Sequence, residues 1–257
     1  MAVRDAILGA FRSKGRVLVA FSGGVDSGLV AKLARDALDG NALAVIADAE
    51  SLARRELAEA TAGAAEIGIP LRVVAVSELA SAEYAANPAN RCYFCREGLA
   101  GVLTGIAAKE GFPAIADGIH LSDLGDVRPG VRAMDEAGVW HPLVEFGLAK
   151  ADVRAMARAL GLSFWDKPSN ACLSSRVPHG TAITLEMLRQ VEAAEDVLRD
   201  FGFRQVRVRH HGTTAKIEVP PDEVPRLERM RDDVAAALRG LGYRETIVDA
   251  AGYRGLA

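Results

Sequence analysis

A short apolar run that ends in a glycine-rich loop and a helix most limits what this chain can fold into. Val17–Phe21 (VLVAF) is entirely apolar, Ser22–Ser27 reads SGGVDS, and apolar residues at helical spacing begin at Val25. An apolar run of this length is typical of a strand buried on both faces of a parallel sheet. A strand that leads through a tight turn into a helix predicts the first half of a βαβ unit.

The same alternation continues through the first two-thirds of the chain. The predicted strands are Val17–Phe21, Ala42–Ala47, Leu71–Val76, Ala114–Ile119 and a fifth near Val139–Val144. The predicted helices cover residues 25–38, about 51–67, 91–110 and 149–160. This pattern predicts an α/β fold with a parallel Rossmann-like sheet and helices on both faces. Ligands of such sheets bind at the carboxyl ends of the strands.

The pattern changes near residue 165, where a stretch rich in proline, serine and glycine begins. After it, Thr184 is suited to cap a helix, and two alternating runs predict strands over Arg204–Arg209 and Ala215–Val219. A last helix is expected from Pro220 to about Leu238, and a short strand over Thr246–Val248. We therefore expect two domains, residues 1–170 and a small α+β domain over 180–257 for substrate binding or oligomerisation.

Composition excludes some classes of protein. Lys and Arg number 31 and Asp and Glu 34, giving a net charge of -3, whereas nucleic-acid-binding domains are usually basic. No apolar run approaches the ~20 residues that span a bilayer, and the N-terminal segment does not resemble a signal peptide. Three cysteines argue against a disulfide framework and for a reducing compartment. We expect a cytoplasmic protein with no membrane and no nucleic-acid partner.

The SGGVDS loop has the features of an anion site. Gly23 and Gly24 allow a tight turn, the helix that begins at Val25 offers free N–H groups, and Ser22 and Ser27 add hydroxyl donors. The loop lacks the lysine of a Walker loop and the three glycines of a dinucleotide fingerprint. The alternative interpretation is a glycine turn with two helix caps.

Three carboxylates are expected near this loop. Asp26 lies in the first turn of the helix and is a candidate to bind Mg²⁺ or to orient the loop. Asp48 and Asp117 follow the second and fourth predicted strands, so both are expected at the same edge of the sheet. Either of them is equally suited to cap the helix that follows it.

The three cysteines leave several chemistries open. Cys92 and Cys95 form a C-x-x-C motif and Cys172 lies in the irregular stretch. The motif is compatible with half a zinc site that takes His179 or His120, with a redox pair or with packing. A third possibility is that three thiolates hold an iron–sulfur cubane. One iron would then lack a protein ligand, which suits sulfur transfer.

Several motifs resemble known families. SGGVDS after a strand is the signature of the PP-loop, or ATP pyrophosphatase, family. RCYFC, DGIHLSDLGDVRPG and PSNACLSSRVPHGT resemble, more narrowly, the LarE family of PP-loop sulfur-insertion enzymes in nickel-pincer nucleotide cofactor synthesis. This resemblance extends from the loop to Glu218 and covers most of the chain. His120 and Ser122 depart from the asparagine and the small or acidic residue that we expect there.

The resemblance implies a reaction and its cofactors. ATP would be split between its α- and β-phosphates, with pyrophosphate on residues 22–27 and Mg²⁺ as counterion. AMP would pass to a carboxylate of pyridinium-3,5-biscarboxylic acid mononucleotide, and sulfur would then replace the oxygen. In one version of the family Cys172 gives up its own sulfur. In the other it joins Cys92 and Cys95 to hold a [4Fe-4S] cluster, which the extra pair favours here. A homohexamer and a separate, unnamed sulfur donor are also implied.

The resemblance also implies which residues meet the substrate. Arg176 follows Cys172 and is expected at the sulfur site, beside Ser175. Arg207 and Arg209 lie two apart on a predicted strand, so one face would present both guanidinium groups to a phosphate. A solvated strand face is the alternative. The remaining residues that match family positions are Glu195 and Glu218 for substrate, and Asp126 and Arg128 in the loop over the nucleotide.

Three other functions fit parts of the pattern. A tRNA thiolation enzyme of the same family also pairs a PP-loop with a cluster, but the acidic balance disfavours RNA. An amide-forming synthetase that uses ammonia would have no use for three cysteines. A sensor that binds ATP without turnover would release no pyrophosphate when substrate is added.

Overall fold

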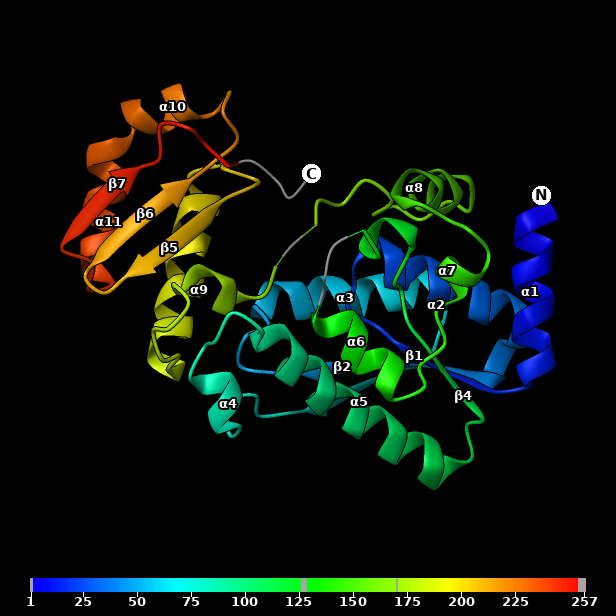
Figure 1. Ribbon diagram of the computed structural model, residues 1–257. Helices are drawn as coiled ribbons and strands as arrows, with labels where there is room; N and C mark the ends of the chain where they lie inside the picture. Colours follow the sequence, from blue (N-terminus) through cyan, green and yellow to red (C-terminus); the bar gives the residue numbers. More distant parts are fainter. Residues whose placement is uncertain (1, 126–128, 170, 254–257) are drawn as a thin grey trace. The chain divides into compact units, whose positions relative to one another are not determined.

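The computed structural model describes residues 2–125, 129–169 and 171–253. The chain divides into two compact units, and each is described here by itself. The first unit comprises Met1–Tyr84 and Asn90–Asn170, and the second comprises Ala85–Ala89 and Ala171–Ala257. Figure 1 labels the helices and strands of both.

A four-stranded parallel sheet forms the centre of the first unit. Its strand order is β3-β2-β1-β4, so β1 lies between β2 and β4. The loop that leaves β1 therefore starts between the carboxyl ends of two neighbouring strands, as the Rossmann-like prediction requires. The fold class is confirmed. The strands are β1 (Val17–Ala20), β2 (Ala42–Asp48), β3 (Leu71–Ala75) and β4 (Ala114–Ala116).

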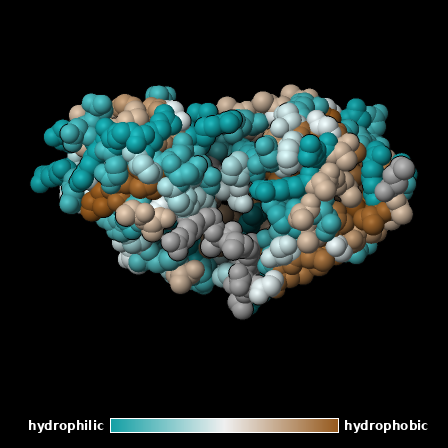
Figure 2. Space-filling model, turned by 90° about the horizontal axis from the view of Figure 1, so that it is seen from above, coloured by the Kyte–Doolittle hydropathy of each residue, from teal (hydrophilic) through white to brown (hydrophobic). Residues whose placement is uncertain are grey.

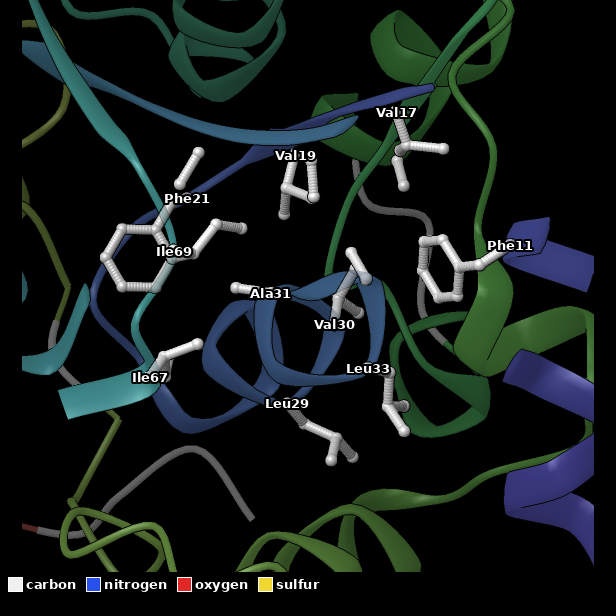
Figure 3. Close-up of a cluster of buried hydrophobic side chains, with 14 of the residues drawn as sticks. Phe11, Val17, Val19, Phe21, Leu29, Val30, Ala31, Leu33, Ile67 and Ile69 are labelled. Carbon is white, nitrogen blue, oxygen red and sulfur yellow. The ribbon is translucent and has the colours of Figure 1, made fainter. Parts of the chain in front are cut away.

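Helices cover both faces of this sheet. Val17 and Val19 of β1 pack into one buried cluster, whereas Leu18 and Ala20 pack into another. The alternation follows because successive side chains of a strand point to opposite faces. The first cluster, part of which is shown in Figure 3, includes side chains of α1, α2, α3 and α8, and the second includes α5 and α6. The helices of the unit are α1 (Ala2–Lys14), α2 (Val25–Leu38), α3 (Arg54–Ile67), α4 (Ala82–Ala85), α5 (Arg91–Glu110), α6 (Pro129–Glu136), α7 (Pro142–Glu145) and α8 (Lys150–Ala159).

The structure corrects one prediction for the first unit and adds one helix. The fifth strand is wrong: the described residues show only a single bridge between Ala116 and Trp140. Helix α7 begins two residues later at Pro142, which has no N–H to donate to a strand ladder and suits the first turn of a helix. Helix α1 was not predicted, although Ile7, Leu8 and Phe11 form its buried side.

The second unit is a small α+β structure. Its sheet has the order β5-β6-β7, with β5 antiparallel and β7 parallel to β6. The predicted cap is confirmed, because Thr184 Oγ1 accepts a hydrogen bond of 3.2 Å from Met187 N. The elements are 3₁₀ helix η3 (Leu173–Arg176), α9 (Leu185–Asp200), β5 (Arg207–His211), β6 (Thr214–Glu218), α10 (Val224–Arg229), α11 (Arg231–Gly240) and β7 (Glu245–Val248).

The single last helix predicted from Pro220 is wrong. The chain makes a turn over residues 220–223 and then forms two helices, which meet at Met230. Basic Arg229 ends the first helix, and Asp232 and Asp233 lie in the first turn of the next, so these three charges complement the helix ends.

Exposed apolar side chains are scattered. Figure 2 shows a face that is mostly hydrophilic, with separate brown patches. The large apolar residues with substantial exposure are spread along the chain, with Leu121 and Leu124 together in one turn: Val3, Val73, Leu121, Leu124, Leu185 and Ile247. Among the described helices, none has the length and apolar character that crossing a membrane requires.

The cluster around α2 predicts a large stability difference between two truncations. Leu33 is fully buried in that cluster, whereas Val3 of α1 is 46% exposed. We expect Leu33→Ala to lower the free energy of unfolding by about 2–5 kcal/mol, because it leaves a cavity. Val3→Ala should change it by no more than about 0.5 kcal/mol. Urea denaturation of both variants measures the difference, and equal effects would mean that this cluster does not hold the unit together.

Candidate functional site

The loop over residues 22–27 has a backbone that only glycine can adopt at one position. Gly23 has a φ of +72°, and a Cβ atom built there would lie 2.4 Å from Cβ of Ala60 on α3. Any side chain at this position would meet both a strained backbone and a steric clash. The loop is thus in close contact with α3 at Gly23, where an added side chain would not fit.

Two serine hydroxyls brace the same loop. Ser27 Oγ accepts a hydrogen bond of 3.1 Å from Ser22 N and lies 3.0 Å from Ser22 Oγ. Gly24 is the N-cap of α2 and has no side chain to occupy the N–H groups of the first turn. The loop and the helix N-terminus together form a pre-shaped site for an anion such as pyrophosphate.

Asp26 is engaged by a lysine that the sequence patterns did not reveal. Lys150 Nζ lies 2.5 and 2.7 Å from the two carboxylate oxygens of Asp26. Lys150 is the first residue of α8, and its backbone N–H donates to Ser122 Oγ. His120 Nε2 lies 3.7 Å from Asp26 Oδ1. The loop therefore receives its cation from a residue 124 positions away in sequence, so no local motif could have identified it.

A second lysine supports the loop from the other side. Lys167 Nζ lies 3.5 Å from the carbonyl oxygen of Gly23 and pairs with Glu56 and Glu59 of α3 at 2.8 and 3.0 Å. Burial opposes the charge of Lys167, but the hydrogen bonds and charges of the two glutamates outweigh it and raise the pKa of this lysine. Lys167 thus remains a cation, and its contacts hold the segment after α8 next to the loop.

The two strand-end carboxylates have different surroundings. Asp48 pairs with Arg54 at 2.6 Å near the start of α3. Asp117 is 3% exposed, and its Oδ1 accepts a hydrogen bond of 3.1 Å from Ile119 N. Its Oδ2 is buried and has no hydrogen-bond partner among the described residues. The next residue, Gly118, is packed so closely on α2 that an added Cβ would lie 2.5 Å from Ser27 N.

His141, which was not predicted as a site residue, lies beside Asp117. Its Nδ1 lies 2.7 Å from Asp117 Oδ1 and its Nε2 lies 2.9 Å from Asp135 Oδ1. Burial opposes protonation, but hydrogen bonds and charge from Asp117 and then Asp135 outweigh it and raise the pKa of His141. The structure thus brings together the loop, Asp26 and Asp117 in the first unit.

The three cysteines form no disulfide, and they belong to two different units. Cys92 and Cys95 lie in the first turn of α5, and their spacing of three places them on one side of the helix. Cys172 is exposed and is the N-cap of η3 in the second unit. Within the described parts of the chain, no group of three or more His, Cys, Asp or Glu side chains is assembled to hold a metal ion.

A buried ion pair organises the loop that carries Cys172. Arg176 and Glu195 are each 1% exposed, and the Arg176 Nε–Glu195 Oε1 distance is 2.7 Å. Arg176 Nη1 donates to the carbonyl oxygens of Ala171 and Cys172 at 2.7 and 3.2 Å. Glu195 also accepts from Arg199 and from Val208 N on the edge strand β5. The guanidinium predicted at the sulfur site therefore acts on the loop backbone.

Arg207 and Arg209 lie on the face of β5 opposite the core residue Val208. Arg209 makes two hydrogen bonds to Glu218, at 3.0 and 2.8 Å, and one to the carbonyl oxygen of Ser175 at 2.9 Å. Four of the predicted substrate residues thus lie together in the second unit: Ser175, Arg207, Arg209 and Glu218.

Tyr253, which was not predicted as a site residue, contacts the guanidinium group of Arg207. Arg207 donates to Tyr253 Oη at 2.8 Å, and its guanidinium lies 4.4 Å from the centre of the tyrosine ring. Burial and the nearby charge of Arg176 lower the pKa of Arg207, and the hydrogen bond that Arg207 donates to Tyr253 opposes this shift. Asp126 and Arg128, predicted to shape a loop over the nucleotide, lie outside the described residues.

Known proteins are similar to this chain at the loop over residues 22–27 and along most of its length. A family model described as NAD synthase matches residues 7–96, which include β1, the loop and α2. That match covers less than half of the chain, so it relates the first unit to the PP-loop enzymes and not to one reaction. An uncharacterized protein of Synechocystis sp. is 42% identical over 241 residues, 93% of this chain and 90% of that protein.

Two further relatives also span nearly the full length. An uncharacterized protein of Methanocaldococcus jannaschii is 25% identical over 95% of this chain and 92% of its own length. The pyridinium-3,5-bisthiocarboxylic acid mononucleotide synthase of Lactiplantibacillus plantarum is 38% identical over 252 residues, 98% of this chain and 91% of the synthase. Identity at this level across both units shows that the chain belongs to the LarE family of PP-loop enzymes.

Proposed function

We propose that this protein is an ATP-dependent sulfur transferase in the synthesis of a nickel-pincer nucleotide cofactor. It adenylylates a carboxylate of pyridinium-3,5-biscarboxylic acid mononucleotide, releases pyrophosphate and replaces the carboxylate oxygen by sulfur. The observation that carries the proposal is the 38% identity to the synthase over 98% of the chain. That similarity includes both units, whereas the match to NAD synthase ends at residue 96.

The first unit carries the activation step. A carboxylate oxygen of the substrate attacks the α-phosphorus of ATP, and the bond to the β-phosphate oxygen breaks. Pyrophosphate then leaves onto the loop over residues 22–27, where its oxygens accept hydrogen bonds from N–H groups at the α2 N-terminus and from the Ser22 and Ser27 hydroxyls. Activation is needed because oxide is a poor leaving group and AMP is a good one.

The carboxylates around the loop suit a Mg²⁺ ion that arrives with ATP. Mg²⁺ is usually held by one or two carboxylates together with substrate phosphates. Asp117 has a buried oxygen without a hydrogen-bond partner in the described chain, so it fits this role. Asp26 fits it only when Lys150 leaves its carboxylate, because Lys150 contacts both oxygens. The ion would neutralise charge on the departing pyrophosphate.

The second unit carries residues suited to the sulfur step. A sulfur nucleophile attacks the acyl carbon of the adenylate, and AMP leaves with the C–O bond electrons. We assign Arg207 and Arg209 to the phosphate and carboxylates of the substrate, with Ser175, Glu195 and Glu218 around them. Arg176 acts as a positioning residue, because it holds the backbone on both sides of the Ala171–Cys172 bond.

The three thiols are of the ligand type that suits a [4Fe-4S] cluster held by Cys92, Cys95 and Cys172. None is in a disulfide, and two are exposed. When bound, the cluster would supply the transferred sulfur atom at an iron that lacks a protein ligand. A sulfur donor reloads the protein, which assembles as a homo-oligomer in the cytoplasm, where thiols stay reduced.

One observation favours a second candidate. The match of residues 7–96 to NAD synthase is also compatible with an amide-forming enzyme that adenylylates a carboxylate and transfers ammonia. An amide formed from added ammonia, with no thiocarboxylate from a sulfide source, would favour this alternative. It gives no role to the three thiols.

The loop geometry predicts a severe effect of one methyl group. Gly23→Ala adds a Cβ that meets Ala60 at 2.4 Å on a backbone with a φ of +72°. We expect pyrophosphate release from ATP, measured with substrate present, to fall at least about 100-fold, since such displacement of a binding loop is costly. Gly9→Ala on α1 is the control, because nothing lies within 4 Å of the added Cβ. Retained activity in Gly23→Ala would contradict this loop assignment.

Cys172→Ala should separate the two steps. We expect it to abolish thiocarboxylate formation but to leave substrate-dependent pyrophosphate release within about threefold of wild type, since Cys172 lies outside the unit that carries the loop. Mass spectrometry measures the thiocarboxylate and a coupled assay measures pyrophosphate. Loss of both activities together would show that Cys172 is structural. Pyrophosphate release without substrate would contradict the proposed function itself.

Metal content distinguishes a catalyst that turns over from a single-use sulfur donor. Protein purified without oxygen should contain about four irons and four acid-labile sulfides per chain, and Cys92→Ala should lose them. The control is Ser81→Ala, a serine in the same unit whose hydroxyl bonds Glu83 and Tyr84 N. Iron-free active protein, with one sulfur lost at Cys172 after turnover, would mean that this cysteine is consumed.

A further inference from the structure

His141 is a buried base between two acids. Its side chain is 13% exposed, and each ring nitrogen faces a carboxylate oxygen, Asp117 Oδ1 at 2.7 Å and Asp135 Oδ1 at 2.9 Å. Both ring nitrogens are thus within hydrogen-bond distance of a carboxylate, and the side chain of His141 bridges the end of β4 and α6.

The bridge leaves one carboxylate oxygen for a ligand. Asp117 Oδ1 is occupied by His141 and by Ile119 N, whereas Oδ2 is buried without a hydrogen-bond partner among the described residues. Leaving a buried acceptor unpaired is costly, and such atoms commonly meet an ion, water or ligand. Asp135, in contrast, is 59% exposed and can be solvated.

Asp117 also determines the shape of the chain beside the ATP loop. Its bond to Ile119 N closes a turn around Gly118. The backbone of Gly118 is so close to α2 that an added Cβ would lie 2.5 Å from Ser27 N and 2.8 Å from Asp26 C. Because Gly118 and the helix N-terminus are already in close contact, a rotation of the Asp117 side chain would displace either the turn or the helix N-terminus.

We propose that His141 is a positioning residue of the ATP site, which holds Asp117 and the turn at Gly118 in the arrangement that binds ATP. The inference rests on the proposed ATP-dependent function and adds to it a residue that does not touch the nucleotide. The ionisable groups that face the ring are Asp117 from β4 and Asp135 from α6. Lys14 and Glu145 contact the neighbouring Trp140.

Two substitutions separate the two hydrogen bonds. The side-chain amide of Asn places its nitrogen near the position of Nδ1, and that of Gln places it near Nε2. His141→Asn should therefore keep the bond to Asp117 and bind ATP within about twofold of wild type. His141→Gln should keep only the bond to Asp135 and bind ATP about tenfold more weakly, as expected for one charge-assisted hydrogen bond. Calorimetric titration of the full chain with ATP and Mg²⁺ measures both.

A control in the same segment isolates the effect. Glu145→Gln changes the acceptor of the Trp140 Nε1–H bond and leaves the bridge intact, so its ATP affinity should equal that of wild type. Equal ATP binding by His141→Gln and wild type, with only a lower melting temperature, would make His141 structural and overturn the inference. Equal weakening in both His141 variants would also overturn it, because Asp117 would not be the target. Failure of wild type to bind ATP would instead overturn the proposed function on which the inference rests.

Discussion

The close approach of other segments to the N-terminal half of α2 is the constraint on which the candidate ATP site depends. Gly23 allows contact with Ala60, Gly118 allows contact with Ser27, and an added Cβ at Gly28 would lie 2.5 Å from the ring of Phe164. These contacts come from α3, the end of β4 and the segment after α8. Each would be lost if glycine were replaced. Close packing therefore fixes the position of the helix N-terminus. Its positive charge can then stabilise a bound anion without any rearrangement of the loop.

The second unit depends on a different kind of interaction. Arg176 and Glu195 are both 1% exposed, and a buried ion pair is maintained only when its remaining donors and acceptors are satisfied. Here they are used: Arg176 donates to the Cys172 loop, and Glu195 accepts from Arg199 and from the edge strand at Val208 N. The pair links α9, β5 and η3, so removing one partner would disturb Cys172 and the Arg207–Arg209 face together.

The predictability of each part follows from the range of the interactions that form it. The PP-loop, β1 and α2 were predictable because strand, turn and helix signals are contiguous. The bounds predicted for α2 and α5 agree with the structure for the same reason. Lys150, His141 and Tyr253 were not predictable, because each acts on a residue brought near only by the fold. The predicted fifth strand failed because its apolar pattern concealed Pro142 at the start of a helix.

The division of the chain into two units corresponds to a division of chemistry. Every residue that we assign to ATP lies in the first unit, and every residue that we assign to substrate recognition lies in the second. The cysteines are the exception, since Cys92 and Cys95 belong to the first unit and Cys172 to the second. An acyl adenylate formed in one unit must meet sulfur before water does. In the proposed reaction the C-x-x-C motif and Cys172 therefore serve the sulfur that intercepts the adenylate.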